Sequence, residues 1–148
     1  MRRSGNIGIK TMRYLIAILA LAGVVVSALA LHVHYSTGTE VCSINEKWDC
    51  GVVNHSPFAE IAHVPVAALG ILGYLALAGL AFTRQRYLLL LLAIVAMGFA
   101  LRLTFIEELV LMVWCVYCVI SQTLIALITL LSLGWFTGEY LGLKRAGR

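Results

Sequence analysis

The chain has 148 residues, of which 61% are hydrophobic and only 12% are charged, and its mean hydropathy is +0.95. A soluble domain is about half apolar, so this composition excludes a soluble protein and indicates an integral membrane protein. The net charge of +4 does not favour nucleic acid, because the basic residues flank the apolar runs. We expect one all-α domain over residues 1–148, a bundle of four transmembrane helices with an extracytoplasmic loop that carries a short helix as a lid.

The first apolar run covers residues 14–31 and follows a basic N-terminal segment. It is long enough to cross about 30 Å of hydrocarbon as a helix. The sequence Ala28-Leu29-Ala30 resembles a signal-peptidase site, so removal of this run as a signal peptide is the alternative. The run is longer than the core of a typical signal peptide, which favours a span.

The loop of residues 32–63 carries the first pair of cysteines. Cys42 and Cys50 are separated by seven residues, enough to close a small disulfide loop. Asp49 suits the N-cap of a short helix, and Cys50 would then lie at a helix N-terminus, where the helix dipole favours the thiolate. The apolar residues of the loop would let it lie on the membrane as a lid. They are Trp48, Val52, Val53, Phe58 and Ile61.

The second and third spans cover residues 64–83 and 87–106. Pro65 lies in the first turn of the second span, where its missing N–H costs little. Arg102 is the one charged residue inside a predicted span and lies near its outer end. We expect its side chain to reach the interface or to pair with Glu107 or Glu108, and a role in a ligand site is the alternative.

The fourth span, residues 113–137, opens on the motif WCVYC. The apolar run begins at Leu109 and is longer than one bilayer needs, so we assign residues 109–113 to a turn and start the helix near Trp114. Cys115 and Cys118 therefore lie at one rim of the membrane. At that rim, a CxxC pair can face thiols in water and a lipid-soluble oxidant in the apolar interior.

The charges orient the four spans. Nine of the eleven lysines and arginines lie before the first span, between the second and third, or after the fourth, and six of the seven acidic residues lie on the other side. By the positive-inside rule, both termini are cytoplasmic, and the loop and the WCVYC rim face outside. All four cysteines then lie in an oxidising compartment, where disulfides form and persist.

Two cysteine pairs also fit interpretations without redox activity. One is a pair of structural disulfides in a non-catalytic membrane protein, such as a small transporter or an assembly subunit. Another is a zinc site of four thiolates, which the oxidising compartment and the wide spacing of the loop cysteines disfavour, and a third is inert buried cysteine. We assign no metal site. Four histidines are interpreted as polar interface residues rather than as a proton relay. They are His32, His34, His55 and His63.

The order of the cysteines and their neighbours over residues 34–133 is more specific than a CxxC motif alone. In chain order, these residues are Cys42, Cys50, Ser56, Gly70, Tyr74 and Cys115-Val116-Tyr117-Cys118. The order resembles the vitamin K epoxide reductase family and its bacterial homologues. Membrane proteins of the disulfide-bond-forming protein B type also have four spans and two cysteine pairs, but their CxxC lies in the first outer loop.

The resemblance implies a four-helix bundle around a quinone of the menaquinone, ubiquinone or phylloquinone type. Cys115 and Cys118 would be the redox centre, with Cys118 nearest the quinone. Cys42 and Cys50 would be the shuttle pair, which takes electrons from a thioredoxin-like partner outside the cytoplasm. Ser56 would support the chemistry near the centre. Many bacterial members carry a fused thioredoxin-like domain, and we expect the partner of this chain to be a separate protein.

Two positions depart from the animal members, which place an asparagine and a tyrosine on the quinone oxygens. Those positions here are Val66 and Gln122. Gln122 lies one helical turn after Cys118 and can donate a hydrogen bond, whereas Val66 cannot. Gly70 and Tyr74 complete the expected quinone site.

We therefore expect a quinone-dependent thiol oxidoreductase in a bacterial inner membrane, which supports disulfide formation in exported proteins. The resemblance also covers reduction of vitamin K quinone or its epoxide. In the expected transfer, an exposed Cys42 serves the partner. The Cys50 thiolate then attacks Cys115, taken as the more exposed sulfur of the CxxC pair, and releases Cys118 toward the apolar core. The stapled, non-catalytic membrane protein is the alternative.

Overall fold

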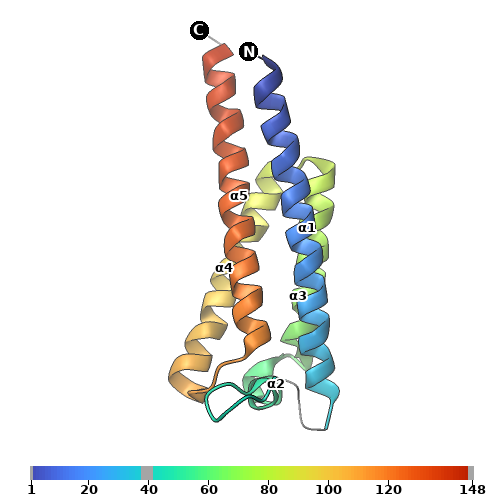
Figure 1. Ribbon diagram of the computed structural model, residues 1–148, viewed down its shortest axis with the longest axis vertical. Coiled ribbons are helices and arrows are strands. Elements are labelled where there is room, and N and C mark those ends of the chain that lie inside the picture. Colours follow the sequence, from blue (N-terminus) through green and yellow to red (C-terminus); the bar gives the residue numbers. More distant parts are fainter. Residues whose placement is uncertain (1, 38–41, 147–148) are drawn as a thin grey trace.

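Four long helices dominate the computed structural model, which describes residues 2–37 and 42–146 (Figure 1). They are α1 (Arg2–Tyr35), α3 (Val66–Thr83), α4 (Arg86–Ile106) and α5 (Val116–Ala146). Each contains an apolar stretch long enough to cross a membrane. The predicted all-α bundle of four membrane-spanning helices is confirmed.

The helix α1 extends beyond the apolar run from which it was predicted, at both of its ends. It begins at Arg2 and continues to Tyr35, whereas the run covers residues 14–31. Hydropathy marks the part of a helix that suits lipid, and no proline interrupts the polar flanks. The start of α1 and the end of α5 lie side by side and project beyond the turn between α3 and α4 (Figure 1).

Small side chains allow the helices to pack closely, as is common between helices in membranes. The buried core joins residues from all four long helices, and many larger apolar side chains face outward, where lipid would cover them. Its smallest members are Ala17, Ala20, Ala78, Ala81 and Ala93. A close approach occurs at Gly23 of α1, where a Cβ atom would lie 2.4 Å from ring carbons of Tyr74 in α3.

Short elements close the bundle at the end opposite the termini (Figure 1). The loop after α1 contains α2 (Cys50–Asn54), the 3-10 turn η1 (Pro57–Ala59), and a hairpin of β1 (Glu60–Ile61) with β2 (Val64–Pro65). The expected short-helix lid is therefore present. In the hairpin, Ile61 pairs with Val64. We refer to residues 42–65 as the lid.

The connection between α4 and α5 differs in detail from the predicted turn. The chain continues from α4 through one π-helical turn, η2 (Glu107–Leu111), before it reverses at Met112, which has a left-handed φ of 53°. An extended segment then leads to the start of α5 at Val116. The helical segment formed by α4 and η2 therefore ends at Leu111, closer to the CxxC motif than the apolar pattern indicated.

Candidate functional site

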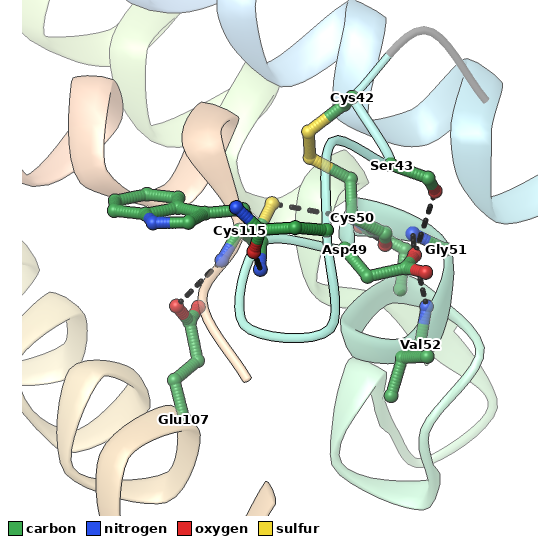
Figure 2. Close-up of a disulfide and its surroundings, with 11 residues drawn as sticks. Cys42, Ser43, Asp49, Cys50, Gly51, Val52, Glu107 and Cys115 are labelled. Carbon is green, nitrogen blue, oxygen red and sulfur yellow. Dashed lines mark hydrogen bonds between the residues drawn. A yellow bond between two sulfur atoms is a disulfide. The ribbon is translucent and has the colours of Figure 1, made fainter. Parts of the chain in front are cut away.

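The lid helix α2 begins at Cys50 because Asp49 caps it. The carboxylate of Asp49 accepts hydrogen bonds from the backbone N–H groups of Gly51 at 2.8 Å and Val52 at 3.1 Å, as expected for an N-cap (Figure 2). The hydroxyl of Ser43 also donates to Asp49, at 2.9 Å. The hydrogen bond from Ser43 is the largest cause that lowers the pKa of Asp49, and the two backbone hydrogen bonds lower this pKa further.

Cys42 and Cys50 form a disulfide with a Cα–Cα separation of 5.5 Å (Figure 2). Both residues are buried, Cys50 completely and Cys42 with 6% of its surface exposed. The expectation of an exposed Cys42 is therefore wrong in this structure, because the end of α1, at Val33, packs into the same cluster. Cys42 is still the more accessible of the two sulfur positions.

Backbone hydrogen bonds join the lid to the segment before the CxxC motif. The N–H of Asp49 donates to the carbonyl of Trp114 at 3.0 Å, and the N–H of Trp114 donates to the carbonyl of Lys47 at 2.7 Å. Trp48 and Trp114 form a parallel bridge, with ring centroids 6.2 Å apart. These contacts hold Cys50 and Cys115 in one buried cluster, as Figure 2 shows.

The two cysteines of the CxxC motif differ in their surroundings. Cys115 precedes α5 and is fully buried under the lid, whereas Cys118 lies in the first turn of α5 and is partly exposed. The expectation that Cys115 is the more exposed sulfur is therefore wrong, because the backbone pairing of Trp114 with the lid covers it. Both cysteines are free thiols. The hydrogen bond from the Cys118 thiol is the main cause that lowers the pKa of Cys115.

Asn54 is a site residue that the sequence analysis missed. Its side chain is buried at the end of α2, and its Nδ2 donates to the carbonyl of Cys50 at 2.9 Å and to Sγ of Cys115 at 3.6 Å. One amide therefore contacts a residue of each cysteine pair. An N–H donor beside a sulfur favours the thiolate over the thiol.

Glu107 is the second residue that was missed. It is only 3% exposed, at the start of η2, and its Oε2 accepts the backbone N–H of Cys115 at 3.2 Å (Figure 2). Its carboxyl group also lies beside the thiol of Cys118, and both residues line the same cavity. An acidic residue inside a membrane segment is a functional candidate by default, but the predicted third span ended at residue 106 and so left Glu107 outside it.

A cavity of about 360 Å³ lies between the helices beneath the lid. Its lining is mainly apolar and includes residues from all four long helices. The residues expected around a quinone all line it, and Cys118 brings a thiol to its wall. They are Val66, Gly70, Tyr74, Cys118 and Gln122, with Ser56 from the lid. The lining therefore fits a flat, largely apolar ring with a few polar atoms.

The polar groups of this cavity are not equally free to bind a ligand. The hydroxyl of Tyr74 lies 2.9 Å from both the carbonyl and Oγ of Ser121, and that of Ser56 donates to the carbonyl of Val53 at 2.8 Å. Gln122 donates from Nε2 to Sδ of Met97 at 3.8 Å, and its Oε1 is buried without a hydrogen-bond partner. Gln122 is therefore the side chain with spare capacity for a polar group of a ligand.

The remaining charged candidates lie around the rim. Arg102 is exposed, and within residues 2–37 and 42–146 no ion pair joins it to Glu107 or Glu108. Glu107 cannot pair with it because its carboxyl group turns inward to the cysteines. His34 is paired with Glu60 at 3.1 Å and also hydrogen-bonds the carbonyl of Asn54, which ties the end of α1 to the lid. The position of this histidine at the membrane interface stays a prediction.

Comparison with known proteins agrees with this geometry. Residues 14–133 match the vitamin K epoxide reductase family. Among individually curated proteins, none matches the chain. The family match covers most of the chain and includes both cysteine pairs and the residues that line the cavity. The chain therefore belongs to the vitamin K epoxide reductase family, whose members are quinone-linked disulfide oxidoreductases.

Proposed function

We propose that the protein oxidises the dithiol of a thioredoxin-like extracytoplasmic protein and passes the electrons to a membrane quinone. The electrons enter at Cys42–Cys50, move to Cys115–Cys118, and leave to a quinone in the cavity. The observation that carries this proposal is the shared cluster of Cys50 and Cys115, with Cys118 in the wall of an apolar cavity. This route connects water-exposed thiols to a lipid-soluble oxidant and supports disulfide formation in exported proteins.

The first step is thiol–disulfide exchange. A thiolate of the partner attacks the Cys42 sulfur, which is more accessible than that of Cys50, and the resulting mixed disulfide is resolved by the partner's second thiol. The partner leaves oxidised, and Cys42 and Cys50 become thiols. The Cys50 thiolate then attacks Sγ of Cys115 in an oxidised Cys115–Cys118 pair and releases Cys118 as the leaving group. Attack by Cys42 on Cys50 restores the loop disulfide and leaves the CxxC pair reduced.

The arrangement in the structure corresponds to the end of this sequence, with the loop pair oxidised and the CxxC pair as two thiols. Asn54 stabilises the sulfur of Cys115 whenever it is a thiolate, through its Nδ2 donor. A quinone supplies the oxidant when bound, because its ring accepts two electrons and two protons. Tyr74, Gln122 and the apolar lining would hold it, and Cys118 faces it from the wall.

The charges and the fold together support the proposed topology. Both termini lie at the end of the bundle away from the lid, as an even number of spans requires (Figure 1). The basic flanks favour a cytoplasmic location for that end, and we propose that the cysteines face outside and that the protein lies in the inner membrane of a bacterium. The quinone would be of the menaquinone, ubiquinone or phylloquinone type. The departure at Val66 and Gln122 indicates quinone contacts that differ from those of the animal enzymes.

The rival proposal is a non-catalytic membrane protein with two structural disulfides. It has less support, because Cys115 and Cys118 are free thiols near a cavity and do not form a second structural disulfide. The test uses purified protein with a short-chain ubiquinone, and the loss of quinone absorbance is followed. The electron donor is either a reduced thioredoxin-like protein or a small dithiol.

The two donors separate the roles of the cysteine pairs. We expect Cys118→Ala to abolish quinone reduction with both donors. We expect Cys42→Ala to abolish it with the protein donor and to spare it with the small dithiol, which reaches the CxxC pair directly. Ile44→Ala, at a loop residue that is 68% exposed, is the matched control and should behave as wild type. Absence of quinone reduction by the wild-type protein with either donor would support the rival.

A further inference from the structure

Glu107 is a buried acidic residue that contacts both cysteines of the CxxC motif. It is 3% exposed, it accepts the N–H of Cys115 at 3.2 Å, and it lines the same cavity as the thiol of Cys118, beside which it lies. A carboxyl group buried in apolar surroundings is costly unless its oxygen atoms are satisfied. The π-helical turn η2 places it there, whereas the next residue, Glu108, is exposed.

The surroundings of Glu107 leave it few groups with which to exchange a proton. Among the cavity-lining residues in the part of the chain that the structure describes, Glu107 is the only one that is normally charged at neutral pH. The other titratable residues of the lining are Tyr74, Tyr117 and Cys118. Cys115 adds a thiol from the other side, and the Cys42–Cys50 disulfide does not titrate. Cys118 is the proton donor that Glu107 contacts directly through its side chain.

Oxidation of the CxxC pair has to move protons as well as electrons. In the reactive state Cys115 is a thiolate and Cys118 a thiol, so the pair holds one sulfur-bound proton. Formation of the Cys115–Cys118 disulfide passes two electrons to the quinone and releases that proton. The quinone needs two protons to become a hydroquinone, so one comes from Cys118 and the other from water at the rim. The proton from Cys118 is released at the wall of a mainly apolar cavity, and Glu107 is the carboxyl group that lines the same cavity.

We propose that Glu107 is the acid–base residue of the redox centre. Its carboxylate takes the proton of the Cys118 thiol as the disulfide forms, and its carboxylic acid then gives that proton up to the cavity, where quinone reduction consumes it. The residue is unchanged at the end of the cycle. This inference rests on the proposed quinone-dependent function, but the sharing of a proton between Glu107 and Cys118 can be tested without a quinone.

The first experiment is quinone-free. In a Cys115→Ala background, the alkylation of Cys118 by N-ethylmaleimide is measured by mass spectrometry from pH 5 to pH 10. Two groups that share a proton titrate in two macroscopic steps, so we expect the alkylation rate to rise in two steps with pH. We expect the additional substitution Glu107→Gln to leave a single step. The same single-step profile with and without Glu107→Gln would overturn the proposal.

The second experiment is a single turnover of the otherwise wild-type chain. Protein pre-reduced by a small dithiol and freed from it is mixed with a short-chain ubiquinone, and the absorbance of the quinone is recorded. Loss of general acid–base catalysis typically slows a step by roughly 10²- to 10⁴-fold, and we expect Glu107→Gln to slow quinone reduction on that scale. Glutamine keeps an oxygen that can accept the Cys115 N–H, so the scaffold is retained. Glu108→Gln is the matched control and should react like wild type.

The outcomes separate the two proposals. A Glu107→Gln protein that reduces quinone at the wild-type rate overturns the role of Glu107 and leaves the proposed function standing. A wild-type protein that reduces no quinone contradicts the proposed function, and the alkylation profiles still decide whether Glu107 and Cys118 share a proton. Glu107→Gln could instead slow quinone reduction and also lower the melting temperature, while the two-step alkylation profile persists. In that case the role of Glu107 is structural and the proposal fails.

Discussion

The contact between Gly23 and Tyr74 allows a prediction whose magnitude follows from the structure. A Cβ atom at residue 23 would lie 2.4 Å from two ring carbons of Tyr74 and 2.6 Å from a third. Carbon atoms pack best at about 3.5–4.0 Å, so the ring has to move by more than about 1 Å. It cannot move freely, because Tyr74 is 5% exposed and its hydroxyl lies 2.9 Å from two acceptor atoms of Ser121.

We therefore expect Gly23→Ala to destabilise the protein although alanine is the better helix former. Overpacking of a tight site costs about 1–3 kcal/mol, and helix propensity returns about 0.8–1.0 kcal/mol. The matched control is Gly79→Ala, because a Cβ atom there meets nothing within 4 Å. The control should be neutral or stabilising. Thermal unfolding in detergent, followed by circular dichroism, measures both variants.

The explanation by a steric clash also predicts coupling. In the double variant Gly23→Ala with Tyr74→Ala, the clash is absent, so the two effects should be non-additive by more than about 0.5 kcal/mol. A displaced Tyr74 ring should also slow quinone reduction, since Tyr74 lines the cavity. A Gly23→Ala protein that is as stable as Gly79→Ala, or additive effects in the double variant, would refute the reasoning.

Three further predictions concern the lid, the redox centre and the opposite end of the bundle. Hydrogen bonds lower the pKa of Asp49, so the stabilising effect of its carboxylate is complete above the unfolded pKa of about 3.9. That effect is lost as the pH falls through the folded pKa of Asp49. Titrations of lid unfolding against pH should show this loss of stability in wild type and not in Asp49→Asn. Cys118→Ala removes the main cause that lowers the pKa of Cys115, so alkylation of Cys115 at pH 7 should slow. Arg13 donates hydrogen bonds to the carbonyls of Ala81 and Phe82 at 3.0 Å each. Arg13→Ala should therefore lower the free energy of unfolding by roughly 1–3 kcal/mol, measured as a lower melting temperature, and Arg13→Lys should recover only part of that stability.

The sequence was sufficient for the parts of the site that depend on local pattern. Hydropathy located the four spans, the Asp49 cap located the start of α2, and the cysteine order indicated the family. The residues expected around a quinone all lie in one cavity wall, because they share helix faces set by regular spacing. Their roles toward a quinone remain predictions.

The parts that failed depend on contacts between segments far apart in the chain. Cys115 was expected to be the more exposed sulfur, but Trp114 pairs with the lid backbone and covers it, and no sequence period encodes that pairing. Glu107 was considered only as one of two possible ion-pair partners of Arg102, whose side chain was otherwise expected to reach the interface. The π-helical turn rotates Glu107 inward, so its true partners are the cysteines that follow eight and eleven residues later.

The most direct test of the proposed relay is to trap the bond between the two cysteine pairs. The Cys118→Ala protein, incubated with a reduced thioredoxin-like partner and then air-oxidised, is digested without reducing agent and analysed by mass spectrometry. Cys50 and Cys115 share one buried cluster, so we predict a single inter-pair linkage that joins their two peptides. The same linkage is expected in Cys42→Ala. A bond between Cys42 and Cys115 in Cys118→Ala, a bond between Cys50 and Cys118 in Cys42→Ala, or no bond between the pairs in either variant would contradict the account.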